Sequence, residues 1–275
     1  MEPHAVALRG VTHTFADVDV LDDVSLTVGV GSFVSIVGPS GCGKSTMLRM
    51  LAGLLAPTHG TLSVNGSSAV LRPGLVGYMA QRDLLLPWKR AFDNACIGGD
   101  VAGKDPTQTR KQARKLFEQF GLAGFENAWP SQLSGGMRQR LALLRTHLIG
   151  ADVMLLDEPF GALDAITRRE LHTWLQQFWL ADNSTATTVV FVTHDVEEAL
   201  LLSDHVHVMS HRPGRIVETI TAPFTRPRAP SIVTSNDFVA RKKQLLSALD
   251  TNSNNEPFSH DDLTPNNGST TAIGN

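Results

Sequence analysis

The sequence predicts an α/β protein with a mostly parallel sheet, and three observations carry this prediction. The runs SFVSIV at 32–37, VMLLD at 153–157 and TVVFVT at 188–193 are almost continuously apolar, which is typical of strands buried on both faces of a parallel sheet. Between these runs, KQARKLFEQF and RRELHTWLQQFW carry apolar residues at helical spacing. Strands that alternate with helices indicate an α/β core.

The N-terminal region predicts an antiparallel β subdomain beside this core. From Ala5 to Val30 apolar residues recur at short intervals, which indicates two strands joined by a polar turn around Asp17 to Asp19. The segment GTLSVNG at 60–66 predicts a further short strand that ends in a turn.

The remainder of the chain predicts helices and a polar tail. The stretch 89–150 contains no convincing strand, so we expect a helical subdomain inserted within a first domain that spans 1–230. A proline-rich connector at 221–230 leads to a helix within 231–250. The tail 251–275 is rich in Asn, Ser, Thr and Gly, and we expect it to be disordered.

Composition limits the classes of function. The 275 residues include 24 Lys and Arg against 27 Asp and Glu, so no strong positive field is available to hold a nucleic acid. Two cysteines, Cys42 and Cys96, make no disulfide framework and fit a reducing cytosol. No signal segment opens the sequence and no run of 18 apolar residues occurs, so we expect that the chain does not cross a membrane by itself.

The segment GPSGCGKST at 38–46 matches the phosphate-loop pattern, with an apolar strand before it and a helical segment after it. Its glycines let backbone N–H groups converge on phosphates at the positive end of the helix. We expect Lys44 to reach the β- and γ-phosphates, Ser45 to bind Mg²⁺ and Thr46 to reach the α-phosphate. All nine residues are candidate nucleotide-binding residues: Gly38, Pro39, Ser40, Gly41, Cys42, Gly43, Lys44, Ser45 and Thr46.

Two adjacent carboxylates end the apolar run 153–157 and begin the next segment. Ligands bind outside the carboxyl ends of strands in open α/β sheets, and neighbouring side chains on a strand point to opposite faces. We therefore expect Asp157 to hold Mg²⁺ and Glu158 to act as general base toward an attacking water.

A second anion-binding helix start is predicted in LSGGMRQR at 133–140. Ser134 can cap a helix whose first turn contains Gly135 and Gly136, which leaves free N–H groups at the helix end. An ordinary helix cap explains the same residues, and spacing alone does not choose between the two interpretations.

The order of these motifs resembles the nucleotide-binding subunit of an ATP-binding cassette (ABC) transporter, over residues 5 to about 220. The resemblance implies that Phe15 stacks on adenine and that Gln81 contacts Mg²⁺ and water and links the site to a membrane partner. It also implies that Asp164 of GALD acts across a dimer interface and that the switch residue His194 lies at the γ-phosphate.

The same resemblance implies partners and a location. Two copies would pair head to tail, with each ATP between the phosphate loop of one copy and the Ser134 helix start of the other. Permease subunits in the membrane and an extracytoplasmic solute-binding protein would complete an importer, with this subunit on the cytoplasmic face of the membrane. A soluble cassette ATPase of repair or translation is the alternative of another class, although the sequence lacks a long coiled-coil insertion and a second cassette.

Further details resemble the nitrate, sulfonate and taurine importer group. They are LLPWKRAFDNA, EPFGALDAITRRELHTWL and FVTHDVEEALLLSDHVHVMSHRPGRIVETI. Relatives that import pyrimidine precursors of thiamine are the alternative, and QRDLLLPW with ALLRTHL leans that way. The segment LALLRTHL departs from the small residues that relatives often carry there, at Leu144 and His147.

The stretch QRDLLLPWKRAF at 81–92 is apolar and is interrupted by a proline. We expect Leu84 to Leu86 and Trp88 to form an exposed patch that receives a short helix of the permease, because such a patch is a liability in a monomer. Burial of these side chains within the helical subdomain is the alternative. The histidines His205, His207 and His211 are expected to be ordinary strand or surface residues rather than metal ligands.

Overall fold

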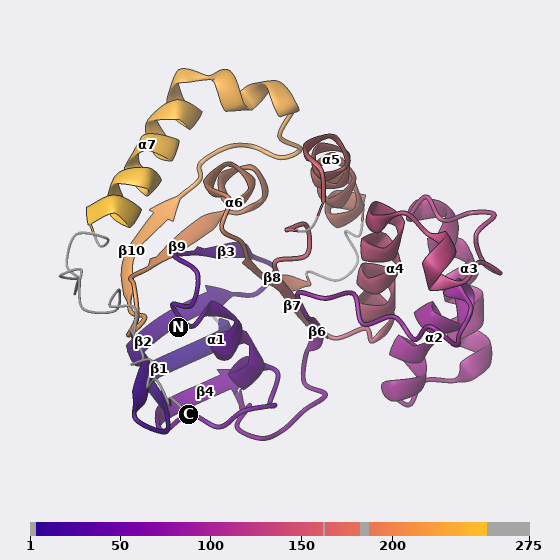
Figure 1. The fold of residues 1–275 in the computed structure, drawn as a ribbon, viewed down its shortest axis with the longest axis horizontal. Helices are drawn as coiled ribbons and strands as arrows, with labels where there is room; N and C mark the ends of the chain where they lie inside the picture. Colours follow the sequence, from indigo (N-terminus) through magenta and orange to yellow (C-terminus); the bar gives the residue numbers. More distant parts are fainter. Residues whose placement is uncertain (1–3, 162, 182–186, 252–275) are drawn as a thin grey trace, which may run out of the picture.

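The computed structural model describes residues 4–161, 163–181 and 187–251, which form two sheets with helices packed around them (Figure 1). A four-stranded antiparallel sheet has the strand order β2-β1-β4-β5, and a six-stranded sheet has the order β10-β9-β3-β8-β7-β6. The predicted fold class is confirmed. The strands are β1 His4–Phe15, β2 Val18–Gly29, β3 Phe33–Val37, β4 His59–Val64, β5 Ser67–Ser68, β6 Gly77–Met79, β7 Val153–Asp157, β8 Thr188–Val192, β9 His205–Met209 and β10 Ile216–Thr221.

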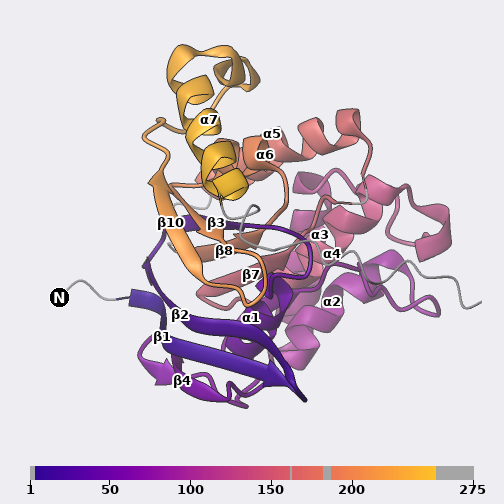
Figure 2. The same ribbon diagram turned by 60° about the vertical axis from the view of Figure 1, so that its left-hand side comes forward.

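The antiparallel sheet is built on a long hairpin. Strands β1 and β2 pair from His4 opposite Gly29 to Phe15 opposite Val18, and β4 pairs with the other edge of β1. The predicted turn is shorter than expected, because Asp19 already pairs with Thr14 inside β2. The hairpin therefore carries Phe15 at its tip, where the strands run past the rest of the sheet (Figure 2).

The six-stranded sheet is parallel except at one edge. Every residue of β3, β7 and β8 is buried, and β3 pairs in parallel with both β8 and β9, as the continuous apolar runs predicted. Strands β6 and β10 have no counterpart among the predicted strands. With three residues, β6 is too short to show a period, and the antiparallel edge strand β10 is mostly exposed or half-buried.

Helices cover both faces of the parallel sheet. Helix α1, Lys44–Leu51, lies between the two sheets, and its buried Met47, Leu48 and Met50 share one apolar cluster with the hairpin and with β3 (Figures 1 and 2). Helices α6, Val196–Leu202, and α7, Asn236–Thr251, pack on the other side against β3, β9 and β10. The phosphate loop therefore joins a buried strand to a helix enclosed between two sheets.

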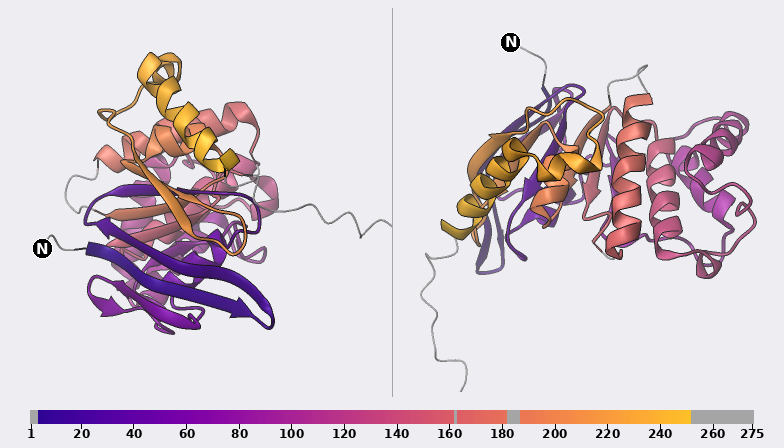
Figure 3. Two further views of the ribbon diagram at one scale, coloured as in Figure 1. Left: turned by 90° about the vertical axis from the view of Figure 1, so that its left-hand side faces the viewer. Right: turned by 90° about the horizontal axis from the view of Figure 1, so that it is seen from above.

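The described chain between β6 and β7 contains only helices, as the strand-free stretch 89–150 predicted. Helices α2, Ala91–Val101, α3, Pro106–Gln119, and α4, Gly135–Leu148, form a lobe at one end of the molecule, next to α5, Ala165–Ala181 (Figure 3). A Cβ at Gly98 would lie 1.9 Å from the Arg145 carbonyl oxygen, so α2 and α4 cross in direct backbone contact. A three-residue 3₁₀ turn, Pro130–Gln132, leads into α4.

The C-terminal elements differ slightly from the predicted boundaries. Strand β10 still includes Thr221, and a 3₁₀ turn at Pro230–Thr234 precedes α7, which begins at Asn236 and ends one residue beyond the predicted helical region 231–250. The tail predicted to be disordered lies, from residue 252 onward, outside the described residues. None of the described helices is both long and apolar enough to span a bilayer.

Candidate functional site

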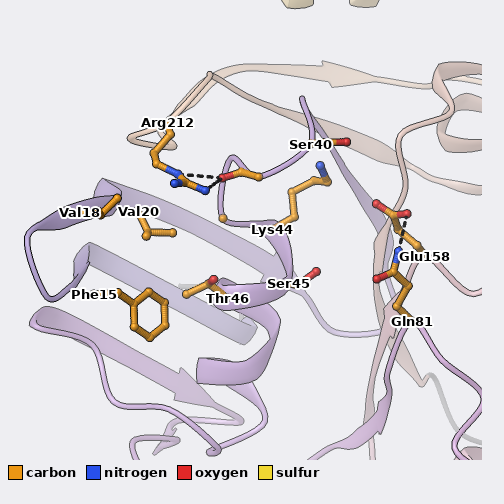
Figure 4. Close-up of a pocket in the computed structure, with 12 residues that line it drawn as sticks. Phe15, Val18, Val20, Ser40, Lys44, Ser45, Thr46, Gln81, Glu158 and Arg212 are labelled. Carbon is orange, nitrogen blue, oxygen red and sulfur yellow. Dashed lines mark hydrogen bonds between the residues drawn. The ribbon is translucent and has the colours of Figure 1, made fainter. Parts of the chain in front are cut away.

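A cleft of about 530 Å³ opens at the carboxyl ends of the parallel strands, beside the start of α1. Figure 4 shows aromatic and aliphatic side chains at one end, the phosphate loop in the middle and two polar side chains at the other end. The lining residues are Phe15, Val18, Val20, Ser40, Gly41, Gly43, Lys44, Ser45, Thr46, Gln81, Glu158 and Arg212. Nine of these twelve are residues that the sequence predicted for nucleotide binding or catalysis.

The phosphate loop requires glycine at specific positions. Gly43 has φ of +105° and caps α1, and a Cβ there would lie 2.5 Å from the Leu21 side chain of the hairpin. At Gly38 a Cβ would meet the Cys42 sulfur and Met209 at 3.0 Å. The loop therefore packs closely against β2 and β9.

Lys44 is buried inside the loop that it ends. Its Nζ donates to the carbonyl oxygens of Gly38 at 2.7 Å and Pro39 at 2.8 Å, and it lies 3.8 Å from the Cys42 sulfur. Burial raises the pKa of the Cys42 thiol, and the nearby Lys44 opposes that effect. The ammonium is thus held in the middle of the loop, where its positive charge would favour an anion in the cleft.

Asp157 faces the start of α1 from the end of β7. Its Oδ1 accepts from Ser45 Oγ at 2.9 Å, and its Oδ2 accepts from the Tyr78 hydroxyl at 3.4 Å. Burial raises the pKa of Asp157, which the Ser45 hydrogen bond opposes, and burial together with the Asp157 charge raises the pKa of Tyr78 to about 12. A buried carboxylate beside a hydroxyl offers the oxygen ligands that Mg²⁺ prefers.

Glu158 turns away from Asp157 because its backbone leaves the strand conformation. Its φ is +44°, in the left-handed region, and its backbone N–H donates to Val192 O at 3.0 Å. Its Oε2 accepts from Gln81 Nε2 at 3.3 Å and lies 3.2 Å from His194 Nδ1. The two carboxylates therefore have different partners, and Glu158 is not in the extended conformation that strand alternation assumes.

The opposite end of the cleft is apolar and carries one arginine that the sequence analysis did not identify. Phe15 is 43 % exposed at the hairpin tip, beside Val18 and Val20 (Figure 4). Arg212, in the turn between β9 and β10, donates through Nε and Nη2 to Gly41 O at 3.1 and 2.9 Å. The guanidinium holds the top of the phosphate loop from outside.

The predicted residues of the helix start 133–140 do not reach this cleft. Ser134 Oγ accepts from Met137 N at 3.2 Å, which is an ordinary helix cap in this single chain. A Cβ at Gly136 would lie 2.6 Å from the Thr167 methyl group, so this glycine also permits close packing of α4 on α5. Asp164 caps α5 through Ile166 N and Thr167 N, and the hydrogen bonds from Thr167 lower its pKa.

Sequence reasoning missed two polar side chains of the site, Arg212 and Tyr78, and the apolar Val18 and Val20 at the end of the cleft. Tyr78 lies on the three-residue strand β6, for which no periodic signal exists. Arg212 is distant from the phosphate loop in sequence. The only local signal for it is its position in an Arg-Pro-Gly turn that follows a strand. Both residues reach the site because β6 and the β9–β10 turn end at the same edge of the sheet.

The segment 81–92 divides its apolar side chains between surface and core. Leu84 and Trp88 are 56 % and 70 % exposed, whereas Leu85 is buried in the core of the helical lobe, so the expected patch lacks Leu85. Two side chains of the helical lobe bond the backbone of this segment. Arg145 donates to Leu84 O at 2.8 Å, and the buried Asn94 donates to Leu86 O at 3.0 Å.

The comparisons with known proteins identify the family of this chain. Residues 21–161 match the family described as ABC transporter. The aliphatic sulfonates import ATP-binding protein of Rhodococcus jostii is 45 % identical over 242 residues, 88 % of this chain and 92 % of that protein. That of Mesorhizobium japonicum is 44 % identical over 226 residues, 82 % of each chain.

A solved structure with the same fold is a dimeric ATP-binding cassette in a post-hydrolysis state bound to ADP and Pi. It has a TM-score of 0.69 and 28 % identity and covers 80 % of this chain and 100 % of that one. The cbiO1 structure from Clostridium perfringens, at 22 % identity and a TM-score of 0.72 over 89 % of this chain and 96 % of that one, shares the fold. This chain therefore belongs to the ABC transporter family, as an ATPase that forms the ATP-binding subunit of an importer.

Proposed function

We propose that this subunit powers the uptake of aliphatic sulfonates. The observation that carries the proposal is the identity of 45 % over 88 % of the chain with a relative named for the import of these solutes. The alternative of a pyrimidine precursor of thiamine is not favoured, and neither is the class of repair or translation ATPases, because the relatives reported above carry sulfonate import names.

ATP would lie along the cleft with its base at the hairpin tip. Phe15 stacks on adenine, the backbone of residues 38–46 holds the phosphates, Lys44 neutralises the β- and γ-phosphates and Thr46 reaches the α-phosphate. The order of side chains in the cleft supports this orientation, since Phe15 and Glu158 line opposite ends (Figure 4).

Mg²⁺ fits the oxygen atoms at the start of α1. Ser45 Oγ, Asp157 Oδ1 and the Gln81 amide oxygen are the ligands that we assign to it, because Mg²⁺ takes oxygen ligands from one or two carboxylates together with phosphates. The raised pKa of Asp157 marks a buried carboxylate with a charge to be compensated. When bound, the ion would neutralise charge on the β- and γ-phosphates.

Hydrolysis would use the polar end of the cleft. Glu158 accepts a proton from the attacking water, Gln81 orients that water and His194 holds the γ-phosphate. The contacts of both Gln81 and His194 with one carboxylate oxygen support these roles, because they place the three groups around one point.

The test of the chemistry is Glu158→Gln in the purified chain. The amide cannot take a proton from water but keeps the size and hydrogen bonds of the side chain, so hydrolysis should fall by about 10²-fold or more while ATP binding persists. Phosphate release and binding of a fluorescent ATP analogue measure the two effects. Hydrolysis at the wild-type rate would remove Glu158 from the role of base.

The functional unit that we propose is a head-to-tail dimer on the cytoplasmic face of the membrane. The Ser134 helix start and Asp164 of one copy complete the site of the other, which is supported by the dimeric state of the similar cassette structures. Permease subunits and an extracytoplasmic solute-binding protein complete the importer. Binding of aliphatic sulfonates by that solute-binding protein, measured by calorimetry, tests the solute.

Leu84 and Trp88 form the permease contact in this proposal. Both are exposed large apolar side chains, and they stand on a backbone segment that Arg145 and Asn94 hold from the helical lobe. The segment begins at Gln81, so a force on the permease contact reaches the hydrolysis end of the cleft through a few residues of chain.

A further inference from the structure

A buried carboxylate lies behind the His194 loop and does not face the cleft. Glu198, in the first turn of α6, is 5 % exposed. Its Oε1 lies 2.5 Å from His172 Nε2 of α5, and its Oε2 accepts a hydrogen bond from the Thr193 hydroxyl. A buried carboxylate is costly unless both oxygens have partners, and here each oxygen has one.

The Thr193 hydroxyl connects this carboxylate to the residues on both sides of His194. Thr193 directly precedes His194, and its Oγ1 also accepts from the backbone N–H of Asp195 at 3.0 Å. Asp195 in turn caps α6 through Glu197 N and Glu198 N, at 2.9 and 3.1 Å. The backbone before and after His194 is therefore fixed by one hydroxyl that Glu198 holds in place.

The other end of the network belongs to the helix that follows Asp164. Arg168 lies one turn before His172 on α5, so both face the start of α6. Arg168 Nη2 donates to Leu163 O at 3.0 Å, and Nη1 lies 3.6 Å from Asp195 Oδ2. Two neighbouring turns of α5 are thus connected to the segment that carries His194, one through Arg168 and one through His172.

A third segment of the site also touches the network. The Phe160 ring, two residues after Glu158, packs edge-on against His172, with ring centroids 5.5 Å apart and an interplanar angle of 61°. Phe160 also contacts Phe191, which lies on β8 shortly before Thr193. His172 therefore contacts the segment that carries Glu158 through Phe160. Through Glu198 it is also connected to the segment that carries His194.

We propose that His172 and Glu198 form a positioning pair that fixes the His194 loop and transmits movement of the Asp164 loop to it when a second copy of this chain binds. This inference rests on the proposed roles of Asp164 and His194. Neither member of the pair touches the nucleotide. A well-packed apolar pair would fill the same space at no cost in unpaired polar groups, so fold stability alone does not call for two ionisable side chains here.

The first test compares His172→Leu with Gln176→Leu in the full-length chain. Gln176 is a matched control because it lies one turn further along α5, is equally buried, and uses its side chain to bond the Arg228 backbone at 2.8 and 3.2 Å. We expect His172→Leu to lower kcat for ATP about tenfold with KM changed less than twofold, and Gln176→Leu to leave kcat within twofold. Equal kcat in the two variants would overturn the proposal.

Two substitutions of Glu198 provide a second test. This test does not depend on whether His172→Leu folds. Glu198→Gln keeps an oxygen and an N–H at the same places, so it can bond both Thr193 and His172 and should retain kcat within about threefold. Glu198→Leu removes both hydrogen bonds and should lower kcat as much as His172→Leu does. Full activity of Glu198→Leu would contradict the proposal, and so would equal losses in Gln and Leu.

Transmission is tested by combining substitutions. Asp164→Asn keeps the helix cap of α5 but removes the charge that is proposed to act across the dimer. If His172 transmits the movement of this loop, the double variant with His172→Leu should lose no more activity than the more impaired single variant. If the activity loss of the double variant equalled the product of the two single losses, the two residues would act independently. That result would refute transmission.

The failure of this inference is distinguishable from the failure of the proposed function. If Glu158→Gln hydrolyses ATP at the wild-type rate, the assigned chemistry is wrong, whatever His172 does. If Glu158→Gln is inactive as expected and His172→Leu is fully active, the ATPase assignment stands and only the positioning pair is refuted.

Discussion

At the scale of single residues, the site depends on side chains whose backbone or burial is unusual. Glu158 is a non-glycine residue in the left-handed region, a conformation that costs about 1–3 kcal/mol and is characteristic of functional sites. The sequence identified Glu158 because two adjacent acids precede Pro159 at the end of an apolar run. It did not reveal the left-handed backbone of Glu158, which occurs together with a hydrogen bond from Glu158 N to Val192 O on a strand distant in the sequence.

Arg212 should contribute to nucleotide affinity. Its guanidinium is the second cationic group among the residues that line the cleft and holds Gly41 O, so Arg212→Ala frees the loop and removes a charge near the phosphates. We expect ATP affinity to fall about two- to tenfold, since the side chain is exposed. Titration of a fluorescent ATP analogue measures this.

The control for Arg212 is Arg215→Ala. Arg215 lies near the same turn but bonds Asp22 and does not line the cleft. An equal loss of affinity in the two variants would show that the turn, rather than the guanidinium of Arg212, affects binding.

His207 should make the fold sensitive to acid. Burial, with a smaller effect of His205, lowers the pKa of His207 to about 4, whereas the ordinary value is 6.5. Between these values the unfolded chain binds the proton and the folded chain does not, so this contribution to stability is complete above pH 6.5 and is lost progressively as the pH falls toward 4.

The measurement for His207 is urea unfolding of the wild type and of His207→Gln at pH 7 and pH 5. We expect the wild type to lose about 2 kcal/mol more than the variant over this interval. The control is His59→Gln, because His59 is exposed. Parallel pH dependence of the wild type and His207→Gln would show that other groups cause the acid sensitivity.

At the scale of elements, the segment 81–92 shows how a loop can present apolar side chains without a regular structure. Asn94 donates to the carbonyl oxygens of Leu86, Lys89 and Arg90, and accepts from Leu86 N at 2.7 Å. Leu84 has φ of +47°. One buried amide thus replaces the hydrogen bonds that a helix or strand would supply, which leaves the outward face free for a partner.

Trp88→Glu should separate hydrolysis from transport. The ring is 70 % exposed, so a charge is tolerated in the free subunit, but it would be buried unpaired against an apolar permease helix. We expect ATP affinity to remain within twofold and solute uptake by the reconstituted complex to fall about tenfold or more. Uptake and phosphate release are measured in the same proteoliposomes.

The matched control for Trp88 is Leu71→Glu. Leu71 is 63 % exposed and lies outside the segment, so the substitution introduces the same charge on another exposed apolar side chain. Equal uptake in Trp88→Glu and the wild type would exclude a permease contact at Trp88.

At the scale of the whole molecule, the proposed composite site draws on two separate parts of the chain. The cleft holds the phosphate loop, the hairpin and the acids, whereas Ser134 lies on the helical lobe and caps its own helix. Of the described residues, none from α4 lines the cleft. In the proposed head-to-tail dimer, the two parts would meet across two nucleotides, and this would give the helix start at Ser134 a role beyond capping its own helix.

ATP-dependent dimerisation should therefore require both the cleft and the helix start at Ser134. Binding of ATP to a single chain should require the cleft alone. In the Glu158→Gln background we expect ATP to double the mass in light scattering. Adding Ser134→Glu should prevent this by placing a carboxylate against the γ-phosphate of the partner site. ATP affinity of the monomer should stay within twofold, because Ser134 is outside the cleft.

Ser68→Glu is the control for dimerisation, since Ser68 is exposed on the edge strand β5. ATP-dependent dimers of the Ser134→Glu protein would remove the helix start of α4 from the composite site. Loss of dimers in Ser68→Glu as well would indicate a general effect of charge.

The sequence by itself determined the three buried parallel strands β3, β7 and β8, the phosphate loop, the two acids and the order of motifs. These are local features, because burial on both faces gives a continuous apolar run, and a loop that wraps phosphate needs glycines at fixed spacing. Only the tertiary structure decided that Arg212 and Tyr78 join the site, that Leu85 is buried while Trp88 is exposed, and that His172 contacts Glu198. Each of these depends on the packing of segments distant in the chain, and a single sequence records no such contact.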